Sequence, residues 1–299
     1  MENERKQLAE SISIDEQIAN LRNIGLIIED EEYAKEILND ISYFRIIKAY
    51  SLRLKPKNGN YNEGVRFEDI TNLYFFNANL RHILFPIIEI VEINLRCRIA
   101  NYFSEKYGVL GYKKAENFSN PEYHKLFLED IDSEVKRNSR SPFISNYRRN
   151  YENGEIPLYA LVEVFSFGTL SKYYKNMLPE DKKAVANMFG VHYTYFESWI
   201  ENIAYVRNKC AHYGRLYNAK FTKTPIMYKQ YNDKNRGDKG KITNNRLFAT
   251  IVCIKHILSD TKQWDEFVDK LEESISKYEV ADISTMGFVD DWRDILRKK

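Results

Sequence analysis

The chain has 299 residues, of which 43% are hydrophobic and 29% charged, an ordinary composition for a globular protein with a sizeable core. Its formal net charge of +2 excludes a strong overall basic field, so any surface for nucleic acid has to be a local patch. Three widely spaced cysteines without a CxxC pair exclude a disulfide framework and argue against a zinc site, so we expect reduced thiols, no metal and no cofactor.

The first 60 residues predict short helices followed by a loop. The charged N-terminus lacks the apolar core of a signal peptide, and we expect none. Ser13 and Glu16 have the spacing of a capping box, which opens a helix to about residue 24, where Gly25 is a natural stop. A second helix is predicted over 30–40. The aromatic and β-branched run 43–54 is compatible with a helix or a strand, and 55–60 has the composition of a turn.

One long helix, or two joined end to end, is predicted from residue 67 to about residue 107. Its apolar residues keep three- and four-residue spacing: Leu80, Leu84, Ile87, Ile88, Val91, Leu95 and Ile99. Four charged residues interrupt its most apolar part, which is therefore too polar to span a bilayer. We accordingly expect a cytoplasmic protein that does not engage a membrane.

The second half of the chain also predicts helices. Residues 111–155 are polar and predict short helices and loops, Pro157 begins a helical run that Gly168 interrupts, and Pro179 and Gly190 bound the next helix. Helices are then predicted over 194–212, 246–258 and 262–278, with a polar loop over 228–245. Because no run of alternating strands is convincing, we predict an all-α fold, divided into an N-terminal helical segment (1–60), a helical bundle (61–260) and C-terminal helices (261–299).

The candidate site is the segment Arg207-Asn208-Lys209-Cys210-Ala211-His212, which ends the helix predicted over 194–212 and is called the motif below. Arginine supplies a permanent cation for phosphate, and histidine exchanges a proton near neutral pH. This spacing also recurs by chance, so on its own it favours a surface arginine and a helix-end histidine that interacts with the carbonyl end of the helix.

Helical geometry separates the two outer residues of the motif. Asn208 and His212 lie on nearly the same face, whereas Arg207 lies about 140° away from His212 at the angular step of an α-helix. They converge if the helix loosens near Gly214, if the long arginine side chain wraps around, or if two subunits meet about a two-fold axis. Asn208 can orient His212 through an i, i+4 hydrogen bond.

These residue types suit the cleavage of RNA without a metal. RNA carries its own nucleophile, the 2′-OH, and His212 can take its proton or donate one to the 5′-oxygen leaving group. Arg207 can hold the nonbridging oxygens and stabilise the charge that develops on them. The expected products are a 2′,3′-cyclic phosphate and a 5′-OH.

Four sequence blocks resemble one family. Residues 199–218 resemble the signature of the Abi-like abortive-infection proteins (AbiD and AbiF type), bacterial phage-defence proteins built on a HEPN helical bundle. Blocks 43–50, 80–96 and 157–171 resemble the family's N-terminal aromatic–arginine motif, its long central helix and its third block. Two departures are visible: Tyr213-Gly214 stands where histidine and a small polar residue are common, and Tyr217 replaces a usual tryptophan.

The resemblance implies a HEPN-like bundle with additional N- and C-terminal helices and a metal-independent endoribonuclease activity. In that family Arg207 and His212 would be catalytic, Asn208 would position them, and a homodimer would commonly assemble the site from two copies. It also implies control of the nuclease and association with a structured noncoding RNA. The alternatives are a non-catalytic RNA-binding module that uses the motif to grip phosphate, and a purely structural helical protein.

Residues outside the catalytic trio also fit RNA. The predicted RNA-binding residues combine cations with aromatic rings, as single-stranded RNA requires: Arg45, Lys48, Tyr50, Arg148, Arg149, Tyr213 and Arg215. For the stretch around Tyr50, a packed aromatic face with a solvated basic face is an equal alternative. Glu92 is predicted to pair with Arg96 one turn further on, with the orientation of Arg207 or His212 as its second possible role. Cys210 is predicted to be a small buried residue.

Overall fold

The computed structural model describes residues 10–56, 59–231, 236, 240–258 and 261–298, and within these ranges it is helical without a β-strand. Only isolated bridges occur there, between Ile27 and Arg66 and between Phe118 and Met177. The all-α prediction is therefore confirmed, while a HEPN-like arrangement within that class stays a prediction. No helix among the described residues is both long and apolar enough to cross a membrane.

The chain forms two compact units. The first comprises Met1–Ala78 with Ile275–Ala281, and the second comprises Asn79–Ser274 with Asp282–Lys299. The three segments predicted from the sequence stay a prediction.

The first unit begins with two short helices, α1 (Ile14–Asn23) and α2 (Glu31–Asp40). The predicted capping box is present: the Glu16 backbone N–H donates to the Ser13 hydroxyl at 3.2 Å, and the Ser13 N–H donates to the Glu16 carboxylate at 2.7 Å. Gly25 ends α1 with a φ of 87°, a left-handed conformation that glycine adopts without strain. The run 43–54, whose sequence is compatible with a helix or a strand, is helical. It contains a π turn over Phe44–Lys48 and a 3₁₀ turn over Ser51–Arg53.

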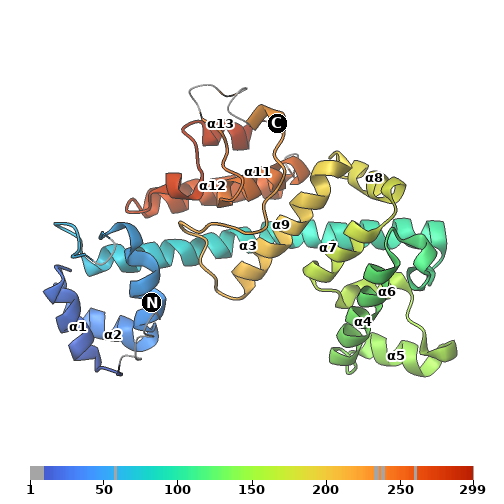
Figure 1. Cartoon of the computed structure of the whole chain (residues 1–299), viewed down its shortest axis with the longest axis horizontal. Helices are drawn as coiled ribbons and strands as arrows, with labels where there is room; N and C mark the ends of the chain where they lie inside the picture. The colour runs from blue at the N-terminus through green and yellow to red at the C-terminus, as the bar shows by residue number, and fades with distance from the viewer. Residues whose placement is uncertain (1–9, 57–58, 232–235, 237–239, 259–260, 299) are drawn as a thin grey trace, which may run out of the picture. The chain divides into compact units, whose positions relative to one another are not determined.

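Helix α3 runs unbroken over Phe67–Tyr107, as predicted, and is 41 residues long (Figure 1). Its predicted apolar positions are all buried, and each has at most 3% of its surface exposed. Repetition of apolar residues every three or four positions over such a length explains why the helix continues through Pro86. From residue 79 on, α3 belongs to the second unit and carries charged side chains toward the motif.

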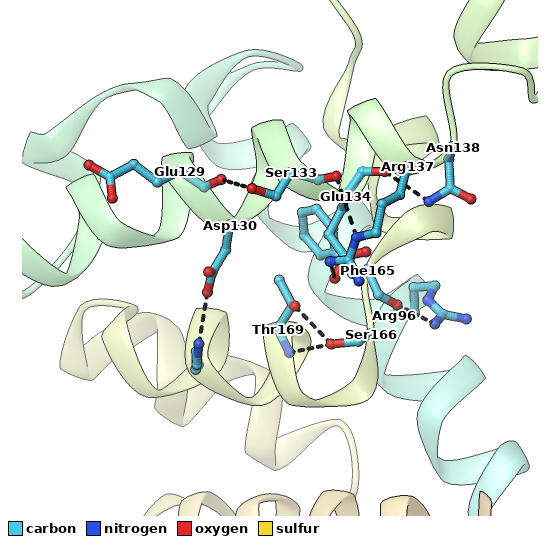
Figure 2. Close-up of polar contacts among 11 residues, drawn as sticks. Arg96, Glu129, Asp130, Ser133, Glu134, Arg137, Asn138, Phe165, Ser166 and Thr169 are labelled. Atoms are coloured by element: carbon cyan, nitrogen blue, oxygen red, sulfur yellow. Dashed lines mark hydrogen bonds and ion pairs between the residues drawn. The ribbon is translucent and has the colours of Figure 1, made fainter. Parts of the chain in front are cut away.

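The polar stretch 111–155 is more ordered than predicted. It contains α4 (Pro121–Arg137), 17 residues long, and α5 (Pro142–Asn150). Four buried residues of α4, His124, Phe127, Ile131 and Val135, recur every three to four positions, and this stripe packs on α7. Lys172 of α7 donates to Asp130 of α4 at 2.7 Å at the edge of this contact (Figure 2). The prediction of short elements was wrong for α4 because the apolar stripe is thin within a polar composition.

The remaining helices of the second unit include the one that carries the motif. They are α6 (Leu158–Leu161), α7 (Phe167–Asn176), α8 (Pro179–Asn187), α9 (Tyr193–Ala211), α11 (Leu247–Leu258), α12 (Lys262–Lys277) and α13 (Trp292–Arg297), of which α12 extends its end into the first unit. Helix α9 packs against α7, α8 and α11 (Figure 1). Gly168 was predicted to interrupt a helix, and this prediction was wrong. Ser166 caps α7, so Gly168 lies in the first turn of that helix. The tail helix α13 lies in the segment 261–299, for which C-terminal helices were predicted, but no bounds were predicted for it.

Candidate functional site

The motif occupies the last turn of α9 and the turn that follows. His212 is the C-cap residue, and its backbone N–H donates to the carbonyl of Asn208 at 3.0 Å. The next two N–H groups turn back onto the helix, from Tyr213 to Cys210 at 3.2 Å and from Gly214 to Lys209 at 2.7 Å. These backbone bonds close the end of the helix and satisfy carbonyls that it would otherwise leave open.

Two residues of this turn are constrained by its geometry. Tyr213 has a φ of 55°, the left-handed conformation that costs a residue other than glycine about 1–2 kcal/mol. A Cβ atom on Gly214 would lie 3.0 Å from the Lys209 carbonyl oxygen, so the turn closes this tightly only with glycine there. The Tyr213 side chain is 69% exposed. A strained backbone thus carries a largely exposed aromatic residue next to His212 in the sequence.

Arg207 points from α9 toward α3. Its Nε donates to Oε2 of Glu92 at 3.2 Å, and its guanidinium lies 5.6 Å from the centre of the Phe85 ring. The two Nη groups donate to no other group in the described part of the chain. With its side chain 30% exposed, Arg207 is held by one edge and keeps its two terminal amino groups for another acceptor.

Glu92 is shared between two arginines. Its side chain is 8% exposed, and its second oxygen, Oε1, accepts from Arg96 at 2.8 Å. Arg96 in turn donates to the carbonyl oxygen of Phe165 at 2.9 Å, just before α7 (Figure 2). The predicted Glu92–Arg96 pair is confirmed, and its proposed second role has a structural counterpart because the same carboxylate orients Arg207.

The side chains of Arg207 and His212 are not hydrogen-bonded to each other within the described part of the chain. No hydrogen bond joins the side chains of Asn208 and His212 among the described residues either. His212 and Asn208 are exposed at the helix end, while Arg207 turns to α3. This is the divergence that helical geometry predicts, because α9 stays regular up to Ala211. A catalytic role for the three residues stays a prediction.

Arg81 is a residue of this region that the sequence pattern did not indicate as functional. It lies on α3 and is 6% exposed, and its Nη1 donates to the carbonyl oxygen of Gly214 at 3.5 Å. Arg81 and Arg207 both act electrostatically on the Cys210 thiol, yet burial dominates and raises the pKa of Cys210 to about 12. Cys210 is therefore a buried, protonated thiol, as predicted. The sequence feature that could have indicated Arg81 is a charged residue among the apolar, buried positions of α3.

Three of the predicted RNA-binding residues lie in the first unit. Arg45 and Lys48 belong to the π turn, and Lys48 lies 5.9 Å from the centre of the Tyr43 ring. Tyr50 differs from its prediction: it is 5% exposed and packs edge-on against Tyr74 at 5.7 Å. Its ring belongs to the core of the unit, which corresponds to the packed-aromatic alternative.

The other predicted RNA-binding residues lie in the second unit. Arg148 and Arg149 are exposed in the last turn of α5, and Arg215 is half-buried after the motif. The neighbours of the α5 arginines, Tyr147 and Tyr151, line an open cavity of about 440 Å³ together with Tyr159. Across the described residues, no group of three or more His, Cys, Asp or Glu side chains is placed to hold a metal ion.

Comparison with known proteins identifies the family of the chain. A family model described as Abi-like protein matches residues 36–218, well over half of the 299 residues, and this match includes the motif. Neither the curated proteins nor the solved structures contain a match. On the strength of the family match, the chain belongs to the Abi-like protein family.

Proposed function

We propose that this Abi-like protein is a metal-independent endoribonuclease of the HEPN type whose active site is the motif at the end of α9. Membership of the Abi-like family associates the chain with abortive infection, a bacterial defence against phage. The nuclease activity is the proposed means of that defence, because cleavage of RNA stops the growth of an infected cell.

The anchoring of Arg207 is the observation that carries the proposal. Its Nε is fixed by Glu92, a carboxylate that is almost fully buried, while both Nη groups have no partner among the described residues. A phosphate needs two donors in a fixed fork, and a pre-oriented guanidinium supplies them without reorganisation at the moment of reaction. A purely structural arginine would instead use its terminal amino groups within the fold.

His212 supplies the proton chemistry in this proposal. Its ring is exposed at the C-cap of α9, where a substrate can reach it. The ring takes the proton of the 2′-OH or donates one to the departing 5′-oxygen, and Arg207 neutralises the charge that builds on the nonbridging oxygens. Cleavage leaves a 2′,3′-cyclic phosphate and a 5′-OH.

A homodimer is the proposed state in which the site is complete. Arg207 and His212 turn away from each other within one chain, so two copies can pool an arginine and a histidine about a two-fold axis. If so, mixing inactive Arg207→Ala and His212→Ala proteins restores part of the activity, because mixed dimers contain one intact pair. A mixture that stays inactive while exchanging subunits contradicts a shared site.

The proposed substrate surface extends from the motif to other predicted residues. Tyr213 offers an open ring for base stacking, and Arg148, Arg149 and Arg215 can contact phosphates. A structured noncoding RNA is the proposed regulatory partner, since a nuclease of this kind has to be restrained in an uninfected cell. RNA that copurifies with the protein, identified by sequencing, tests this part of the proposal.

The second candidate function is an RNA-binding module without catalysis. The lack of a hydrogen bond between Arg207 and His212, among the described residues of one chain, favours it because a phosphate grip requires only the arginine. Both functions predict copurifying RNA. Only the enzyme generates new 5′-OH ends.

Variants of the motif test the proposal. His212→Ala and Arg207→Ala are each expected to lower RNA cleavage at least about 100-fold, the usual contribution of a general acid or base and of a donor that stabilises developing charge, and to abolish toxicity in cells. The matched control is His82→Ala, which removes an exposed histidine of α3 outside the motif. Circular dichroism verifies that each variant folds. Wild-type cleavage by folded His212→Ala refutes the assignment.

A further inference from the structure

Arg81 is buried near the motif without a counter-charge among the described residues. It is 6% exposed, yet none of the described carboxylates lies within ion-pair distance of it. Within the described part of the chain, its one hydrogen bond is the long one from Nη1 to the carbonyl oxygen of Gly214. Burial of a charge without a partner is costly, so such a group usually has an anion to bind.

The described surroundings of Arg81 are short of negative charge. One carboxylate, Glu92, serves both Arg96 and Arg207, and Arg81 adds a third guanidinium to the same region of α3 and α9. The Cys210 thiol interacts with Arg81 and Arg207 but cannot balance them, because burial keeps it protonated. The carbonyls at the end of α9 compensate in part through the negative end of the helix dipole.

Arg81 also has donors that the described fold does not use. Its Nε and Nη2 have no hydrogen-bond partner among the described residues, and neither belongs to the fully enclosed unpaired atoms, whereas Nε of Arg96 does. Some of the guanidinium surface is therefore left uncovered by the described part of the fold. Arg81 reaches the end of α9 through its bond to Gly214, which lies two residues after His212 in the sequence.

We propose that Arg81 is a second phosphate-binding residue of the motif site and holds a phosphodiester of RNA together with Arg207. This inference rests on the proposed function for the identity of the ligand. Two planar guanidiniums match the oxygens of one phosphate, and arginine suits this role because its fork of donors is fixed and always charged. The phosphodiester supplies the negative charge that the described residues lack.

Binding of an RNA that cannot be cleaved tests this role separately from catalysis. The probe is a short fluorescein-labelled oligouridylate with 2′-O-methyl groups, which block the nucleophile, and the affinity is measured by anisotropy between about 50 and 200 mM salt. Arg81→Gln is expected to weaken binding about tenfold and to lower the salt slope by up to about 0.7, the value for one fully neutralised phosphate on a single strand.

The matched control is Arg98→Gln on the same helix. The Arg98 guanidinium lies 3.9 Å from the centre of the Phe189 ring and donates to the Met188 carbonyl oxygen, so its contacts lie outside the motif. This variant removes the same charge from α3 as Arg81→Gln does. It is expected to keep the wild-type affinity and salt slope.

Two further variants complete the test. Arg81→Lys keeps the charge and loses the fork, so it is expected to retain the salt slope with weaker binding, and it replaces Arg81→Gln if that variant does not fold. Arg81→Gln combined with Arg207→Gln is expected to be non-additive, because both residues hold one phosphate, and additive losses contradict a shared phosphate.

The outcomes separate this inference from the nuclease proposal. Wild-type affinity and salt slope in Arg81→Gln, or wild-type affinity in Arg81→Lys, overturn the inference even if RNA is cleaved. Weakened binding in these variants, without any cleavage by the wild type, supports the inference while the nuclease proposal fails.

Discussion

Replacing Glu92 by glutamine removes the charge that anchors Arg207 and leaves the size of the side chain unchanged. The carboxylate is 8% exposed and serves Arg207 at 3.2 Å and Arg96 at 2.8 Å, so the substitution leaves two guanidiniums close together without their shared counter-charge. We therefore expect a less stable protein in which Arg207 is no longer held in one orientation.

The size of the effect follows from the burial of the three groups. Breaking a buried pair by removing one partner costs about 3–5 kcal/mol. Solvent screens part of this at Arg207, whose side chain is 30% exposed, and glutamine still accepts one hydrogen bond, so we expect a loss of about 2–3 kcal/mol. The entropy of unfolding is about 2.1 cal/mol/K per residue, so for 299 residues this loss lowers Tm by about 3–5 °C.

Thermal unfolding and steady-state cleavage of RNA measure the two consequences. Glu92→Gln is expected to lower Tm as stated and to lower kcat at least about tenfold, while KM does not rise, because the charge of Arg207 persists and only its orientation is lost. The matched control is Glu89→Gln, an exposed glutamate one turn away on α3, for which neither quantity should change. An unchanged Tm and kcat in Glu92→Gln would refute the anchoring of Arg207.

Three further predictions follow from the same region and its support. Alkylation at about pH 8 should modify the exposed Cys97 in the folded protein and spare Cys210, whose pKa burial raises to about 12; rapid reaction of both thiols would contradict this. Burial lowers the pKa of His256 from 6.5 to about 4, so the unfolded chain binds the extra proton first and stability should fall as pH drops from about 6.5 to about 4; His256→Gln should flatten that part of the denaturation profile. Gly214→Ala should destabilise the turn by about 1–3 kcal/mol and reduce cleavage, since its Cβ would lie 3.0 Å from the Lys209 carbonyl oxygen; an unchanged Tm would show that the turn yields.

Local signals explain the parts of the fold that the sequence predicts well. The capping box at Ser13, the apolar repeat of α3 and the end of α9 at His212 each depend on residues within a few positions of one another. The length of α4 was missed because four apolar positions within a polar stretch become significant only when α7 covers them. The π turn at Phe44–Lys48 likewise has no distinctive local pattern.

The sequence predicts which residues belong to the candidate site better than it predicts the contacts that these residues make. Spacing alone separated Arg207 from His212, and the pairing of Glu92 with Arg96 followed from their positions one turn apart. The contacts from Glu92 to Arg207 and from Arg81 to Gly214 join residues 115 and 133 positions apart, and such contacts exist only after α3 and α9 have packed. Burial of Tyr50 depends in the same way on Tyr74 of a different helix.

The most direct test of the central claim is the chemistry of the RNA ends that the purified protein produces in the presence of EDTA. Wild-type protein is expected to generate new 2′,3′-cyclic phosphate and 5′-OH ends, mapped by sequencing, and folded His212→Ala protein is expected to generate none above background. The same ends at the same rate from His212→Ala, or no new ends from folded, dimeric wild-type protein that binds the RNA, would contradict the account.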